Sequence, residues 1–222
     1  MKVLAISAHP DDETLGCGGT LLRHRACGDE ISWVVTTQTH EPQWSQESVT
    51  QRSAEVDVVA TQYGMSKVFR LGFPTIRLET VPQADLIDRL REAIVEVRPE
   101  VVYLVHDGDV HSDHHAVFTA TMAVLKTFYM RSLGVRRVLC FETLSSTEAA
   151  PVQLHRTFLP QIYHDISPYL EEKLLVMAQF ASETQEDPWP RGPSAIKALA
   201  RFRGASIGVD YAEAFMLIRE VD

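Results

Sequence analysis

Short apolar segments alternate with longer amphipathic segments along the first part of this chain. The apolar segments are rich in β-branched and aromatic residues and read as buried strands over 2–7, 30–37, 67–71, 101–105 and 137–142. The segments with apolar residues at helical spacing are 14–27, 48–63, 81–97 and 113–129. Strand and helix in alternation predict parallel βαβ units. We therefore expect an α/β fold, a three-layer Rossmann-like sandwich with a mostly parallel sheet.

The last third of the chain is less regular. Helices are predicted over 168–180 and 195–203, and a final strand over 214–219. A loop rich in proline and charge (183–193) separates these helices, and a polar stretch (38–51) precedes the second helix of the chain. Both segments are expected to flank a pocket. The chain length predicts a single domain over 1–222, in which the part from about residue 160 completes the substrate pocket.

The charge balance argues against nucleic acid as a partner. The chain has 21 Lys and Arg against 30 Asp and Glu, a formal net charge of −9, whereas binding to a phosphate backbone rests on basic residues. Three scattered cysteines predict a reducing, cytoplasmic location. The first residues do not form a signal peptide, and no apolar run is long enough for a membrane span. A monomer and a homo-oligomer are both compatible with the sequence.

The segment after the first strand, 8–13 (AHPDDE), places a histidine and two aspartates on one turn. Open parallel sheets bind ligands beyond the carboxyl ends of their strands. His9 and Asp12 are close enough to share a divalent metal such as zinc or iron, which leaves Asp11 free to act as a base. The alternative is that the acidic residues cap the helix that follows. The glycines within 16–19 do not match a phosphate-binding loop and are predicted to allow close helix packing.

The segment after the fourth strand, 106–115, holds four of the nine histidines. His111 and His114 are three residues apart, so on a helical turn they face the same side. One can bind a metal while the other stands beside the substrate, and Asp113 can orient one of them. His115 points elsewhere and is the weakest ligand candidate.

Together the two loops predict one metal site, with His9, Asp12 and His114 as its ligands. Two histidines and one carboxylate, with a position left open for water, are typical of a catalytic site, whereas structural zinc sites are closed by four ligands. The alternative is an ordinary surface loop rich in His and Asp, in which Asp113 caps a helix.

The same two segments resemble the motifs of a known family. AHPDDE (8–13) and HSDH (111–114, an HxDH pattern) are similar, in order and in strand context, to the signatures of the PIG-L/LmbE family of zinc-dependent N-acetylglucosaminyl de-N-acetylases. Weaker similarity covers most of the chain. Arg52 and Glu55 resemble the family's RxxE pair, and the segment 203–215 resembles its C-terminal region.

The resemblance implies a role for each candidate residue. The implied ligands of Zn²⁺, or alternatively of Fe²⁺, are His9, Asp12 and His114. Asp11 is implied as the general base, and His111 as the group that polarises the amide carbonyl or protonates the leaving amine. Asp113 is implied to orient His111. Arg52 is implied as a substrate contact, although a surface charge paired with Glu55 is the alternative.

The implied activity is hydrolysis of the acetamide of an N-acetylglucosamine-type conjugate by zinc-activated water. The chain would then be a zinc-dependent amidohydrolase acting on linear amide C–N bonds, and its partner a small amino-sugar molecule. The alternatives are deacylation of another N-acyl amino sugar or acylated natural product, and a non-catalytic sugar- or nucleotide-binding module. Asp11 and His111 argue against the binding module, which needs neither. Asp109 stands where some thiol-pathway members carry a tyrosine, so no tyrosine contact to an oxyanion is expected here.

Overall fold

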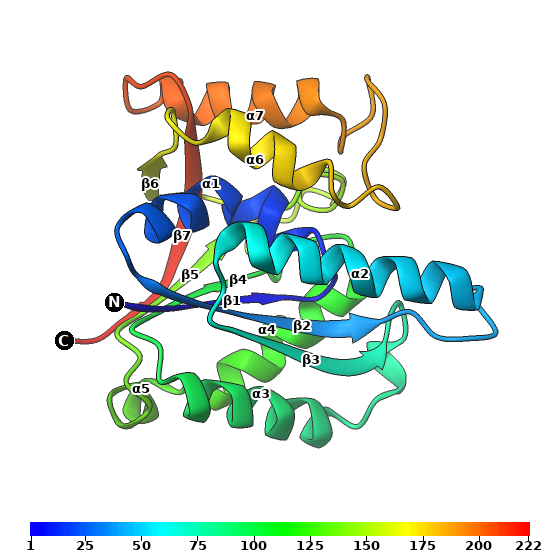
Figure 1. The fold of residues 1–222 in the computed structure, drawn as a ribbon. Helices are drawn as coiled ribbons and strands as arrows, with labels where there is room; N and C mark the ends of the chain where they lie inside the picture. Colours follow the sequence, from blue (N-terminus) through cyan, green and yellow to red (C-terminus); the bar gives the residue numbers. More distant parts are fainter.

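A seven-stranded sheet crosses the molecule, and the computed structural model describes residues 1–222 (Figure 1). The strands are β1 (Lys2–Ser7), β2 (Glu30–Gln38), β3 (Lys67–Pro74), β4 (Val101–Leu104), β5 (Arg137–Phe141), β6 (Ile162–Asp165) and β7 (Ala212–Glu220). Their order is β3-β2-β1-β4-β5-β7-β6. The first five pair in parallel, and β7 is antiparallel to both of its neighbours. The predicted mostly parallel sheet is confirmed, whereas β6 was not predicted.

Helices cover both faces of the sheet, which gives the three predicted layers (Figure 1). One face carries α1 (Asp12–Ala26), α2 (Gln46–Tyr63), α6 (Leu170–Met177) and α7 (Pro193–Ala205). The other carries α3 (Gln83–Val97), α4 (Ser112–Val124) and α5 (Thr127–Leu133), and a short 3₁₀ turn, η1 (Leu78–Thr80), precedes α3. Because both faces are covered, strands such as β1 are buried along almost their whole length. Every helix is too short or too polar to cross a lipid bilayer.

The single helix predicted over 113–129 is wrong, because the chain forms two helices there. α4 ends at Val124, and Lys126 adopts an extended conformation (φ −59°, ψ 139°) before α5 begins. The guanidinium of Arg219 on β7 donates a hydrogen bond to the carbonyl of Leu125 at this break. The partner comes from the last strand of the sheet, so the local spacing of apolar residues could not indicate the interruption.

Glycines allow α1 to lie close to the sheet and to the segment that follows β6. A Cβ atom on Gly16 would stand 2.0 Å from Cδ2 of Phe141, and one on Gly19 would stand 2.8 Å from the side chain of Ile166. Both neighbours are fully buried. The prediction that these glycines serve helix packing is confirmed.

β1 and β4 are neighbours at the point where the strand order reverses. The chain moves outward from β1 to β2 and β3 on one side, and from β4 to β5 on the other. Ile6 pairs with Leu104, so the two strands end at the same edge of the sheet. The loops that follow them therefore meet at the place where doubly wound sheets bind their ligands.

Candidate metal centre and active site

A pocket of about 360 Å³ opens at this edge of the sheet. Its size lies within the range of small-molecule sites, roughly 300–1,000 Å³. The polar stretch after β2 contributes Trp44 to its wall, and the charged loop before α7 contributes Glu183 and Arg191. Both segments were predicted to flank a pocket, and both do.

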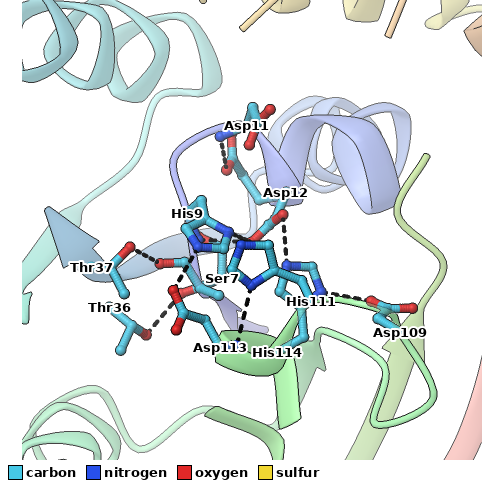
Figure 2. Close-up of polar contacts among 12 residues, drawn as sticks. Ser7, His9, Asp11, Asp12, Thr36, Thr37, Asp109, His111, Asp113 and His114 are labelled. Carbon is cyan, nitrogen blue, oxygen red and sulfur yellow. Dashed lines mark hydrogen bonds and ion pairs between the residues drawn. The ribbon is translucent and has the colours of Figure 1, made fainter. Parts of the chain in front are cut away.

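The loop after β1 is fixed by hydrogen bonds to β2. The hydroxyl of Thr36 donates to the carbonyl of Ser7, and that of Thr37 donates to the carbonyl of Ala8, each at 2.8 Å (Figure 2). These side chains are buried. The backbone that presents His9 is thereby held in place by the neighbouring strand.

Three side chains from the two loops converge, and they are His9, Asp12 and His114. Their donor atoms all lie within 4.8 Å of one another. His9 Nδ1 is 3.7 Å from one oxygen of Asp12, and His114 Nε2 is 3.3 Å from the other (Figure 2). The structure thus brings together the three residues that the sequence predicted as metal ligands.

Each of the two histidines contacts a further carboxylate through its other ring nitrogen. His9 Nε2 lies 2.9 Å from Oδ2 of Asp113, and His114 Nδ1 lies 2.6 Å from Oδ2 of Asp109 (Figure 2). Metal-binding histidines usually donate their second N–H to a carboxylate or carbonyl, which fixes the tautomer and the ring orientation. The pair of contacts leaves His9 Nδ1 and His114 Nε2 free to face a common point.

The partner expected for Asp113 differs from the one observed. Its carboxylate contacts His9, not His111, and also accepts hydrogen bonds from the backbone N–H groups of Ile76 (2.7 Å) and Leu78 (3.2 Å). His111 instead accepts a hydrogen bond at Nδ1 from the backbone N–H of Asp113 (3.2 Å), as the N-cap of α4. A second grouping of donors, His9 with His111 and Asp113, is also compact. The carboxylate in that grouping is already occupied by three donors, so the grouping around Asp12 fits a metal better.

The electrostatics of the converging donors favour a positive charge between them. Burial would raise the pKa of Asp12, but the neighbouring imidazoles of His114 and His9 hold it far below its ordinary value. Burial would likewise lower the pKa of His114, yet the carboxylates of Asp12 and Asp109 raise it to about 10. A divalent cation at this point would meet the carboxylate of Asp12 directly, and Asp109 would act on it through His114. Two imidazoles and a carboxylate are donors that suit Zn²⁺ or Fe²⁺, so the residues fit the implied metal.

Asp11 occupies a strained backbone conformation beside this centre. Its φ of 110° lies in a region that non-glycine residues rarely adopt, a strain typically worth about 1–3 kcal/mol and often found at functional sites. Its N–H donates to Oε2 of Glu13 (3.2 Å), and its side chain does not cap α1. Burial, followed by the charges of Asp12 and Glu183, raises the pKa of Asp11, and Arg191 at 3.4 Å offsets part of this rise. A buried carboxyl with a raised pKa suits a general base.

Arg52 lines the pocket, but its partner is not the one considered from the sequence. Its guanidinium contacts Oε1 of Glu183, while Oε2 of Glu183 contacts Nη1 of Arg191 at 2.6 Å. Glu55 instead accepts hydrogen bonds from the backbone N–H (3.2 Å) and the hydroxyl (2.7 Å) of Ser182, so the alternative pairing of Arg52 with Glu55 is wrong. Glu183 and Arg191 were not predicted as site residues. The only signal for them was the charge of the loop that contains both.

A profile of the family described as GlcNAc-PI de-N-acetylase (PIG-L) matches residues 4–125. The matched segment includes His9, Asp12 and His114, and also the carboxylates behind the histidines. The chain belongs to the PIG-L family. The family resemblance read from AHPDDE and HSDH is thereby confirmed.

Curated proteins resemble this PIG-L family member over most of its length. It is 29% identical over 186 residues to the uncharacterized deacetylase YaiS of Escherichia coli (strain K12), a match covering 81% of this chain and 90% of YaiS. It is 27% identical over 236 aligned positions to the diacetylchitobiose deacetylase of Thermococcus kodakarensis, with 98% and 83% of the two chains covered. Among solved structures, the conserved protein TT1542 of Thermus thermophilus aligns with a TM-score of 0.78 and 28% identity, over 99% of this chain and 96% of that one.

A buried ion pair supports α1, the helix that follows the AHPDDE segment of this PIG-L family member. Cys17 interrupts α1 with non-helical torsions (φ −137°, ψ 16°). The backbone N–H groups of Gly19 and Thr20 beyond the interruption donate to the carboxylate of Glu213 (2.8 and 2.7 Å). Lys173 contacts the same carboxylate at 2.7 Å. Glu213 is thus a structural partner, because its carboxylate stabilises the N-terminus of the second half of the helix.

Proposed function

We propose that this chain is a metal-dependent N-deacetylase that hydrolyses the acetamide of an N-acetylated amino sugar. The observation that carries the proposal is the convergence of His9, Asp12 and His114 in a pocket, with Asp11 beside them. Family membership and a relative named diacetylchitobiose deacetylase support both the reaction and the substrate class. The proposed ion is Zn²⁺, and Fe²⁺ suits the same donors.

Bound zinc would supply a lowered pKa for water and a polarised carbonyl, with His9, Asp12 and His114 as the residues that hold it. The carboxylate of Asp11 would accept the proton of the attacking water. The same carboxyl group, once protonated, can deliver that proton to the nitrogen of the leaving amine. General acid–base assistance of this kind is typically worth about 10²–10⁴-fold.

His111 would act as a neutral hydrogen-bond donor. Burial, helped by the charges of His9 and His114, lowers its pKa to about 4, so the ring is neutral near pH 7. Because Nδ1 accepts the N–H of Asp113, the proton of the neutral ring belongs on Nε2. His111 lines the pocket, where an Nε2–H can polarise an amide carbonyl and stabilise an oxyanion. Asp113 acts as a positioning residue, through its carboxylate on His9 and its N–H on His111.

The two ends of the chain contribute to one pocket, which supports a single domain over 1–222. β6 and β7 extend the same sheet as β1–β5. Glu183 and Arg191 line the same pocket as His9 and His114, and Glu183 contacts Arg52, the proposed substrate contact. All three cysteines are unpaired, which supports a reducing compartment, the cytoplasm.

A direct test measures acetate release from N-acetylglucosamine and N,N′-diacetylchitobiose by the zinc-loaded protein. Asp11→Asn is expected to keep its metal while losing about 10²–10⁴-fold in turnover. His114→Ala is expected to lose the metal itself. Metal content is measured on both variants, so that the two kinds of loss are separated.

Asp107→Asn is a matched control for these variants. Asp107 lies in the loop after β4 and contacts Arg156 (3.5 Å), away from the pocket. The control should retain both metal and activity. Full turnover in Asp11→Asn would contradict the assignment of Asp11 as the general base. Failure to release acetate from any N-acetyl sugar would refute the proposed substrate class.

A further inference from the structure

The charged side chains that line the pocket balance one another. Three are carboxylates and three are guanidinium groups. The carboxylates belong to Asp11, Asp12 and Glu183, and the guanidinium groups to Arg52, Arg70 and Arg191. The question for specificity is whether any of these cations is free to bind an anionic substrate.

Each guanidinium group already has a carboxylate partner. Arg70 contacts Asp57 at 2.7 Å and the hydroxyl of Ser53 at 2.7 Å. Arg52 and Arg191 both contact Glu183. The pocket wall therefore offers no cation that lacks an acidic partner from the protein.

Glu183 stands between two guanidinium groups in the way that a bound anion would. Oε1 contacts Nη1 of Arg52, and Oε2 contacts Nη1 of Arg191 at 2.6 Å. Its side chain is 16% exposed, and both arginine side chains are 24% exposed, so the cluster is largely shielded from solvent. Paired arginines are a common recognition site for carboxylate and phosphate groups. In this chain a protein carboxylate takes the place of such a ligand.

We infer that Glu183 is a specificity-determining residue that restricts the pocket to N-acetyl sugars without a phosphate or carboxylate group near the arginine pair. The inference rests on the proposed deacetylase function and narrows its substrate class to saccharides that carry no anionic group at the arginine pair. An anionic substituent would have to displace Glu183 from both arginines or lie beside its negative charge. Like charges placed together in a shielded interface disfavour binding strongly.

The first test measures binding and needs no turnover. Inorganic phosphate is titrated calorimetrically into the zinc-loaded wild type, Glu183→Gln and Glu186→Gln. Glu186 lies in the same loop, is exposed and forms no side-chain ion pair, so its variant makes the same charge change away from the arginines. Glu183→Gln should bind phosphate about tenfold more tightly than the wild type, and Glu186→Gln should match the wild type. Equal affinities for all three proteins would overturn the inference.

A second variant, which removes a positive charge instead of a negative one, keeps the inference testable if Glu183→Gln does not fold. Arg52→Gln removes one cation and leaves Glu183 in place, so phosphate affinity should fall below that of the wild type. Unchanged or tighter phosphate binding by Arg52→Gln would contradict the inference.

The second test uses the reaction. The ratio of kcat/KM for N-acetylglucosamine to that for N-acetylglucosamine 6-phosphate and 1-phosphate is measured by acetate release. The wild type should favour the uncharged sugar, and Glu183→Gln should shift the ratio toward the phosphorylated sugars by about tenfold. A wild type that prefers the phosphorylated sugars would overturn the inference while leaving deacetylation intact. Absence of acetate from every sugar would instead refute the proposed function, and the phosphate titration would still decide the role of Glu183.

Discussion

Asp109 offers the sharpest test of how a residue behind a ligand would affect the affinity of this chain for a metal. It is 1% exposed, and its two carboxylate oxygens contact His114 Nδ1 and the hydroxyl of Thr147, each at 2.6 Å. In Asp109→Asn the amide oxygen can accept from His114 and the amide nitrogen can donate to Thr147. Both hydrogen bonds can therefore be kept, and the change removes mainly one buried negative charge.

The expected loss of metal affinity depends on which hydrogen bonds each variant keeps. Loss of a carboxylate behind a metal-binding histidine typically weakens metal affinity about 10–100-fold. Asp109→Asn, which keeps the hydrogen bonds, should lie near the lower end, a factor of about ten or about 1.4 kcal/mol. Asp109→Ala leaves His114 Nδ1 without its partner and the proton of the Thr147 hydroxyl without its acceptor, so it should lie nearer the upper end, a factor of about one hundred.

Zinc affinity is measured by competition with a chromophoric chelator for the wild type, both variants and Asp107→Asn as the control. The metal-free proteins give a second readout by NMR titration of the imidazoles. The pKa of His114, raised to about 10 by Asp12 and Asp109 against the effect of burial, should fall in Asp109→Asn. Zinc affinities of both variants equal to that of the control would refute the assigned role of Asp109.

Three further predictions concern stability, each measured by urea denaturation. Burial, followed by the charges of Arg23, His24 and Arg137, lowers the pKa of His164 from 6.5 to about 4, so the unfolded chain binds this proton first as the pH falls. The free energy of unfolding that depends on neutral His164 is therefore present above pH 6.5 and is lost as the pH falls from 6.5 to about 4. His164→Gln should reduce that pH-dependent loss by on the order of 2 kcal/mol, a value that allows for the partial exposure of the ring. Gly16→Ala should destabilise the fold by about 1–3 kcal/mol because its Cβ meets buried Phe141, and Phe141→Leu in the same chain should recover part of this cost. Lys173→Met should cost about 3 kcal/mol, because the buried carboxylate of Glu213 loses its cation, and a loss below about 1 kcal/mol would contradict that assignment.

The candidate metal centre could be predicted because its residues follow the ends of two apolar strands. His9 and Asp12 follow β1, and His114 follows β4, so the carboxyl-end rule for parallel sheets brings them to one edge. The residue types then limit the chemistry, since imidazole and carboxylate are ligands for zinc-like ions. No knowledge of side-chain positions was needed for either step.

The partners of these residues could not be predicted in the same way. The family resemblance implied that Asp113 orients His111. In the folded chain its carboxylate instead contacts His9 in the loop after β1 and the backbone N–H groups of Ile76 and Leu78. Glu183 and Arg191 are more than 100 residues from the first motif, and only the course of the loop before α7 places them in the pocket.

The alternation of strands and helices, the two loops that carry the chemistry and the donor atoms in each loop follow directly from the order of amino acids. These properties are local, because hydrophobic periodicity and residue type act over a few positions of the chain. Three features depend on the folded chain: which carboxylate faces which imidazole, where α4 ends beside Arg219, and which acidic residue lies between Arg52 and Arg191. Those outcomes depend on burial and on contacts between distant segments, and the strength of a charge interaction is set by the distance and shielding that only the folded chain provides.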